Sequence, residues 1–219
     1  MIDVLSRYRR RRDRVRAEGD CGLAMVEMAI IEPFLALLMA GILEYGTLWR
    51  DNLTVTSSSR AASRVVSNLG TDNLSDYEAL LSLHAGLSAI DGYTLEYVMI
   101  YDASASNGAP SASCFDSSGD PVESAAGNCN VYTAADIATV LALDCTSSCN
   151  QFPANATCTD DLSMTFAYCP QLERSDSQVG GLSSIGVWVR IERDYFTGIF
   201  PGDGVTIEDY SVMKVEPAG

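Results

Sequence analysis

One apolar run dominates the pattern of hydrophobic and polar positions along the chain. It extends from Gly22 to Trp49, and its most apolar part lies between Met28 and Leu48. At about 1.5 Å per residue, a helix over this part is about 31 Å long, which matches the hydrocarbon core of a bilayer. The run therefore predicts a helix that spans a membrane once, close to the N-terminus.

Helical periodicity continues beyond the apolar run. A weak apolar stripe over residues 51–69 predicts that the same helix extends out of the membrane, and Gly70 predicts its end. Residues 76–90 predict a second helix, with Ser75 and Glu78 as a capping box at its start. A third helix is predicted over residues 132–143.

Strand patterns fill much of the remaining chain. Residues 93–101 and 162–168 are rich in aromatic and apolar positions, and residues 185–191 alternate strictly between apolar and other side chains. Residues 205–215 resume the extended pattern after a Pro-Gly-Asp-Gly loop, which predicts an antiparallel pair with the preceding strand. The expected class is α+β: one long N-terminal helix whose first half spans the membrane and whose second half packs on an antiparallel sheet.

Charge divides the chain at the apolar run. The net charge is −15, yet residues 1–22 carry seven arginines against four acids, and the remainder carries seven basic and 25 acidic residues. Basic residues beside a spanning helix stay on the cytoplasmic side, so the N-terminus is predicted inside and the C-terminal body outside. An acidic body is repelled by phosphate backbones, which argues against nucleic acid as a partner.

Cysteines follow the same division. Cys21 precedes the apolar run, and the other six lie after it, an even set for three disulfides in an exported body. The sequence does not choose among the 15 possible pairings. The six candidates are Cys114, Cys129, Cys145, Cys149, Cys158 and Cys169.

Three carboxylates, Glu27, Glu32 and Glu44, interrupt the apolar run. A charge at the middle of a bilayer costs about 2.5–3.5 kcal/mol on insertion scales. One interpretation is an ordinary anchor whose acids reach the interfaces through their flexible side chains. The other is that these acids find partners on neighbouring helices.

Part of the chain resembles a known family. The resemblance rests on a basic leader followed by Gly22, Val26-Glu27, Pro33 and Gly41-Ile42-Leu43-Glu44-Tyr45-Gly46. This array is similar to the N-terminal signature of TadE-like proteins, which are minor pilins or pseudopilins of the tight-adherence (Flp, type IVb) pilus system. Glu32 departs from the family pattern, which usually has an apolar residue before the proline.

The resemblance implies how the protein is processed and assembled. A prepilin peptidase would cut between Gly22 and Leu23, so that Glu27 becomes the fifth residue and neutralises the new α-amino group of its own or an adjacent subunit. Glu27, Pro33 and Glu44 are the expected assembly residues. The implied partners are other pilin subunits, the peptidase, the inner-membrane pilus assembly platform and the lipid bilayer.

The implied organisation has three parts. Residues 1–22 form a cytoplasmic leader, residues 23–49 a transmembrane segment and residues 50–219 an extracytoplasmic domain, with localisation in the bacterial inner membrane and, after assembly, in the pilus. The alternative is a single-span protein with an extracytoplasmic disulfide-rich binding or sensor domain.

Enzyme chemistry finds little support in the sequence. His84 is the only histidine and no activated nucleophile accompanies it. The cysteine spacings do not fit zinc, and the acidic run from Asp116 to Asp120 lacks a full calcium ligand set. We therefore expect no catalytic residues, no metal and no cofactor.

Overall fold

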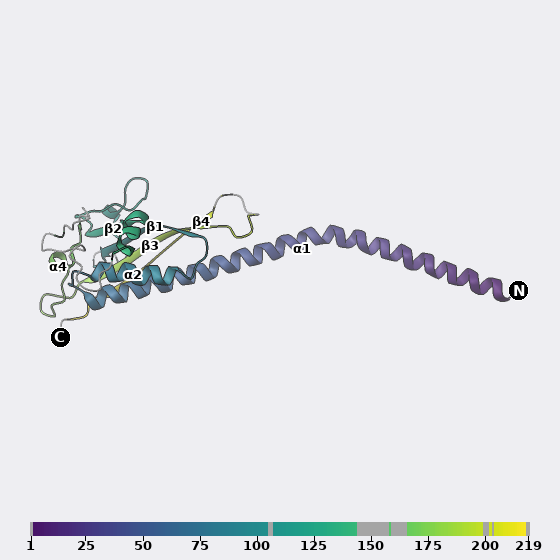
Figure 1. Cartoon of the computed structure of the whole chain (residues 1–219), viewed down its shortest axis with the longest axis horizontal. Coiled ribbons are helices and arrows are strands. Elements are labelled where there is room, and N and C mark those ends of the chain that lie inside the picture. The colour runs from purple at the N-terminus through teal and green to yellow at the C-terminus, as the bar shows by residue number, and fades with distance from the viewer. Residues whose placement is uncertain are drawn as a thin grey trace. The chain divides into compact units, whose positions relative to one another are not determined.

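The longest element is the helix α1 (Ile2–Leu69), which is continuous over 68 residues (Figure 1). The structure, a computed structural model, describes residues 2–104, 107–143, 158, 166–198, 202 and 204–217, with side chains from Gly22 onward. The chain divides into two units: residues 1–47 with 196–200, and residues 48–195 with 201–219. Gly70 ends α1 with a φ of +53°, a left-handed conformation that glycine adopts without steric cost.

The larger unit is built on a four-stranded antiparallel sheet with the strand order β2-β1-β3-β4. The strands are β1 (Tyr93–Asp102), β2 (Cys129–Thr133), β3 (Ser184–Asp194) and β4 (Gly204–Lys214). The last two strands pair along their whole length, from Ser184 opposite Lys214 to Asp194 opposite Gly204. The predicted antiparallel pair is therefore confirmed.

Both faces of the sheet are covered, because successive side chains of a strand point to opposite faces. On one face Val98 and Ile100 of β1 join the alternating apolar residues of β3 and side chains of α1, α2 (Ser75–Leu87) and α3 (Ala134–Leu141). On the other face Met99, Tyr101 and Trp188 pack with Cys114 and Cys129. The long segment between β1 and β2, which includes a 3₁₀ turn at Ala112–Cys114, thus closes the second face.

The second half of α1 packs through small side chains. Val55, Ser59, Ala62, Ser63 and Val66 are buried at helical spacing of three and four residues. The Ser63 hydroxyl donates to the Ser211 carbonyl of β4 at 2.8 Å. These contacts confirm the expected α+β class, with a long N-terminal helix packed on an antiparallel sheet.

α2 lies close to α1 because glycine faces serine where they meet (Figure 1). A Cβ atom added at Gly86 would collide with the Ser58 side chain. Leu80, Leu83 and Leu87 of α2 are buried, as their spacing predicts.

Two details of the predicted elements differ from the structure, and a third lies mostly outside the described residues. Ser75 is the first residue of α2 and not its N-cap, and Leu74, which precedes the helix, makes no side-chain capping hydrogen bond. The predicted capping box is therefore wrong. The Ser75 hydroxyl accepts a hydrogen bond from Arg174 instead of capping the helix. Tyr132 belongs to β2, and the third helix begins later, at Ala134, behind a capping box of Thr133 and Asp136. Most of the strand predicted over 162–168 lies outside the described residues, and the short helix α4 (Pro170–Glu173) follows it.

Candidate assembly site

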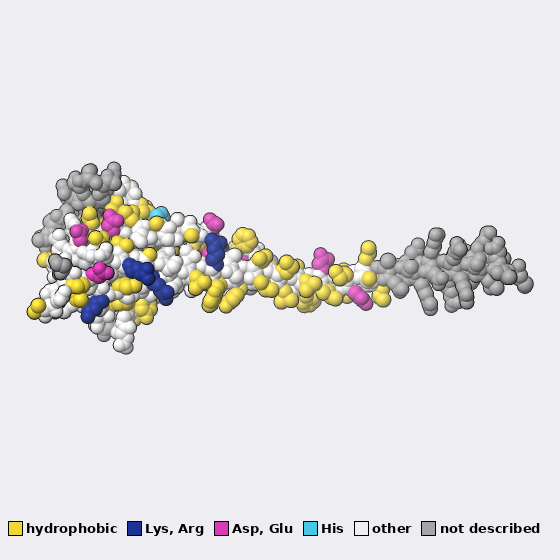
Figure 2. All heavy atoms as spheres, turned by 90° about the horizontal axis from the view of Figure 1, so that it is seen from below, with side chains coloured by type: hydrophobic (Ala, Val, Ile, Leu, Met, Phe, Trp, Pro, Cys, Tyr) yellow, Lys and Arg dark blue, Asp and Glu magenta, His cyan; other side chains and the backbone are white. Residues whose placement is uncertain are grey.

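The N-terminal apolar segment of α1 has no protein cover. Every residue from Gly22 to Met39 is exposed, and the most apolar window has a mean hydropathy of 2.0 with none of it buried. Figure 2 shows this helix as a band of hydrophobic side chains. A surface of this length and apolarity fits a single membrane span, since water is a poor solvent for it.

The predicted processing residues lie at the start of this segment. Nothing approaches within 4 Å of a Cβ built at Gly22, so packing inside the chain does not require glycine there. Glycine in a helix costs roughly 0.5–1 kcal/mol relative to alanine. The described packing therefore gives no reason for a glycine at position 22.

Glu27 and Glu32 are both exposed on the apolar helix. Neither carboxylate makes a hydrogen bond or ion pair among the side chains that the structure describes, which begin at Gly22. Glu27 lies four residues after Leu23, one helical turn, so an α-amino group created at Leu23 would be within its reach. Pro33 lies inside α1 without ending it, although it has no N–H to donate to the preceding turn.

Glu44 has an environment unlike that of the other two acids. Only 2% of it is exposed. Its Oε1 atom accepts from the Phe196 backbone N–H at 2.9 Å, and its Oε2 atom accepts from the N–H and the hydroxyl of Thr197, each at 2.8 Å. Sequence reasoning gave Glu44 an assembly role and missed this contact, because the pattern around 196 carries no signal for it.

Two disulfides are present among the described cysteines. Cys114 pairs with Cys129 and Cys158 pairs with Cys169. Cys145 and Cys149 lie outside the described residues. The first disulfide closes the segment between β1 and β2, a pairing that the sequence left open.

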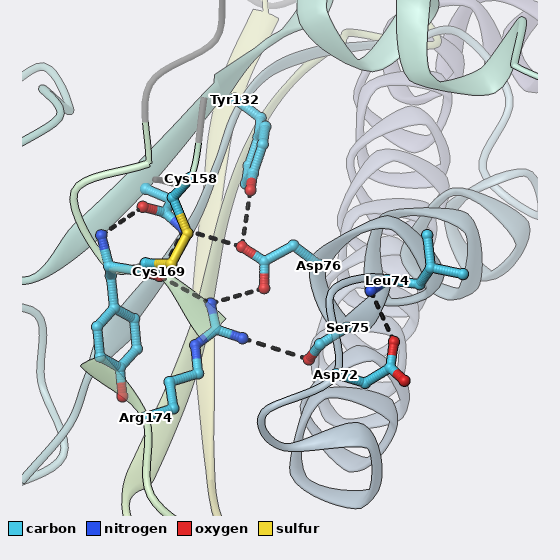
Figure 3. Close-up of polar contacts among 10 residues, drawn as sticks. Asp72, Leu74, Ser75, Asp76, Tyr132, Cys158, Cys169 and Arg174 are labelled. Carbon is cyan, nitrogen blue, oxygen red and sulfur yellow. Dashed lines mark hydrogen bonds and ion pairs between the residues drawn. A yellow bond between two sulfur atoms is a disulfide. The ribbon is translucent and has the colours of Figure 1, made fainter. Parts of the chain in front are cut away.

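A buried charged network fixes the loop that carries the second disulfide (Figure 3). Arg174 forms an ion pair with Asp76 at 2.6 Å, and neither side chain is exposed. The Tyr132 hydroxyl and the Asn130 amide both donate to the same Asp76 oxygen, at 2.7 and 2.9 Å. Burial, followed by the charge of Asp76 and the hydrogen bond to it, raises the pKa of Tyr132 well above its usual value.

The hydrogen bonds and the ion pair of this network join α2, β2 and the segment before β3, as Figure 3 shows. The carboxylates of the acidic turn predicted at Asp116 also bind groups of the protein itself. Asp116 accepts from two backbone N–H groups of its own turn, and Asp120 pairs with Arg190. Among the described residues no group of three or more metal-ligating side chains occurs.

The exposed apolar helix and the antiparallel α+β body fit the class of single-span membrane proteins with one long N-terminal helix. Within this class, residues 22–64 match the family model described as TadE-like protein. The resemblance noted in the sequence is thereby confirmed over this stretch. The matched stretch contains the exposed apolar segment of α1, and over these residues the chain is similar to TadE-like proteins, which are associated with the Tad pilus. No curated protein and no solved structure matches the chain.

Proposed function

We propose that the protein is a minor pilin or pseudopilin of a Tad-type pilus or a related secretion apparatus, cleaved after Gly22 and assembled through its N-terminal helix. The observation that carries the proposal is Glu27: a carboxylate exposed on an apolar helix and without a partner among the described side chains, five residues after a glycine that the described packing does not require. An unpaired charge in hydrocarbon is costly, and a new α-amino group nearby would offset that cost.

The proposed arrangement follows from this processing. Residues 1–22 are a cytoplasmic leader, residues 23–49 cross the inner membrane, and residues 50–219 form the extracytoplasmic body. The seven arginines of the leader support this orientation, and the disulfides of the body suit an oxidising compartment. Cleavage removes Cys21, which leaves an even number of cysteines.

The proposed partners are the helices of other pilin subunits, the prepilin peptidase and the pilus assembly platform. Gly41 and Gly46 support a helix partner, because no atom of the described residues lies within 4 Å of a Cβ at either position. Small residues on a spanning helix allow a second helix to approach closely.

The N-terminus of the native protein tests the proposal. Mass spectrometry is expected to find Leu23 as the first residue, and Gly22→Val is expected to keep the leader, because a side chain blocks the peptidase subsite. Gly41→Ala is the matched control, a glycine substitution in the same helix with equally open surroundings, and it is expected to be cleaved normally. An intact leader on the unsubstituted protein would instead favour a single-span protein with an extracytoplasmic disulfide-rich binding or sensor domain.

A further inference from the structure

The Glu44 carboxylate binds the backbone of a distant segment and is not merely a charge that the helix tolerates. Its two oxygens accept three hydrogen bonds from Phe196 and Thr197, all between 2.8 and 2.9 Å. Its neighbours on the helix, Leu43 and Tyr45, are 55% and 68% exposed, whereas Glu44 is 2% exposed. Phe196 and Thr197 therefore cover the carboxylate of Glu44, while the side chains of Leu43 and Tyr45 stay exposed.

The same hydrogen bonds hold the Phe196 side chain in a solvent-exposed position. The Phe196 backbone is fixed by Glu44, yet 70% of the residue is exposed. Tyr45 and Ile42, within one helical turn of Glu44, are exposed to 68% and 70%. A phenylalanine ring without cover forfeits the gain from burial, roughly 1.5–3 kcal/mol for a large apolar side chain.

The position along the helix identifies what covers these side chains. Glu44 lies 21 residues after Leu23, about 31 Å along an α-helix. A bilayer core is about 30 Å thick, so a helix whose proposed N-terminus at Leu23 lies at one face of the core, rather than five residues outside it, reaches the other face at Glu44. Aromatic side chains are favoured at this boundary, where one side is apolar and the other is hydrated.

We propose that Phe196 and Tyr45 form an aromatic foot that inserts into the bilayer interface at the end of the span farther from the N-terminus, with Glu44 as its positioning residue. The occupant of this surface is lipid, because the exposed apolar surface is continuous with that of the spanning segment. The proposal rests on the membrane-spanning part of the proposed function. It also accounts for the third acid, whose charge is satisfied by three donors where few waters reach it.

Quenching of tryptophan fluorescence by brominated lipid tests the foot. The full-length chain carries Trp49→Phe throughout and is reconstituted into vesicles of phosphatidylcholine and phosphatidylglycerol; Trp188, which is buried in the body, gives a constant background. Phe196→Trp is expected to lose emission at least about twofold with lipid brominated near the headgroup, as for an interfacial aromatic. Val179→Trp, at a body position that is 99% exposed, is expected to stay unquenched.

Leu37→Trp separates failure of the foot from failure of the span. It lies near the middle of the segment and is expected to be quenched most by lipid brominated near the chain ends. If Leu37→Trp is not quenched, the span itself is wrong. If Leu37→Trp is quenched and Phe196→Trp is not, the foot is wrong and the proposed function stands.

The role of Glu44 is tested in the Phe196→Trp background. Glu44→Ala removes all three hydrogen bonds and is expected to abolish the interfacial quenching, because the segment is released from the helix. Glu32→Ala is the matched control, since it removes an exposed carboxylate of the same helix that makes no described contact. Unchanged quenching in Glu44→Ala would overturn the positioning role.

Discussion

At the scale of single residues, position 186 of β3 admits only a hydrogen atom. Gly186 lies opposite Tyr101 in the register of β1 and β3. A Cβ at 186 would overlap the Tyr101 ring, whose hydroxyl donates to the Gly108 carbonyl at 2.7 Å and keeps the ring in place. The ring therefore cannot move aside without losing a hydrogen bond.

Gly186→Ala is expected to lower the free energy of unfolding by about 1–3 kcal/mol, the usual cost of overpacking. Thermal unfolding followed by circular dichroism measures it. Gly180→Ala is the matched control, because the nearest atom to its Cβ is an ordinary 3.8 Å away. Equal melting temperatures for the two variants would show that the ring has room to adjust.

At the scale of elements, the Asp76–Arg174 pair connects α2 to the segment before β3. Asp76→Asn keeps the size of the side chain but leaves the Arg174 charge buried without a counterion. Breaking a buried pair from one side costs about 3–5 kcal/mol, so Asp76→Asn is expected to destabilise the body by about that much. Urea unfolding of the full chain in detergent measures the change.

Two further variants test whether the unpaired charge of Arg174 causes the loss of stability. Asp76→Asn combined with Arg174→Met is expected to be less destabilised than Asp76→Asn alone, because no unpaired charge remains. Glu208→Gln breaks the pair of Arg190 with a carboxylate that is 43% exposed, and is expected to cost less than about 1 kcal/mol. A double variant that is less stable than Asp76→Asn alone would contradict the role of the unpaired charge.

The sequence predicted elements well where one periodicity decided them. The alternation of Ile185, Val187, Val189 and Ile191 requires a two-sided strand, and all four are buried in the core as expected. The end of α1 at Gly70 follows from a single glycine. Boundaries set by tertiary contacts were not predictable. The local sequence around Ser75 predicts an N-cap, but its hydroxyl accepts a hydrogen bond from Arg174, which lies 99 residues away.

The candidate site was predictable to a similar degree. Gly22, Glu27 and Pro33 stand out by type and spacing within an apolar run, and the family match covers all of them. The hydrogen bonds of Glu44 were not predictable, because two of the three donors are backbone N–H groups, 152 and 153 residues away, and backbone donors leave no pattern in a sequence.

At the scale of the whole molecule, buried phenols add to a large negative charge. Burial raises the pKa of Tyr168 to about 12, and it raises the pKa of Tyr132 and Tyr101 as well. The net charge is already −15 at neutral pH, so each phenolate would add to the repulsion within the compact state. We therefore expect the folded protein to lose stability in alkali.

The sign of the effect follows from proton linkage. Below the ordinary tyrosine pKa of about 10, the phenols are neutral in both states and stability does not depend on them. Above it the unfolded chain releases protons first, so stability is expected to fall as pH rises, and the contribution of Tyr168 is expected to keep falling until about pH 12.

Urea midpoints with thiols alkylated, compared at about pH 8 and about pH 11, measure the loss of stability. Tyr132→Phe is expected to be less stable than the unsubstituted protein at the lower pH, because a hydrogen bond to Asp76 is lost, and to decline less steeply. Parallel declines in the two proteins would mean that Tyr132 does not contribute to the alkaline transition.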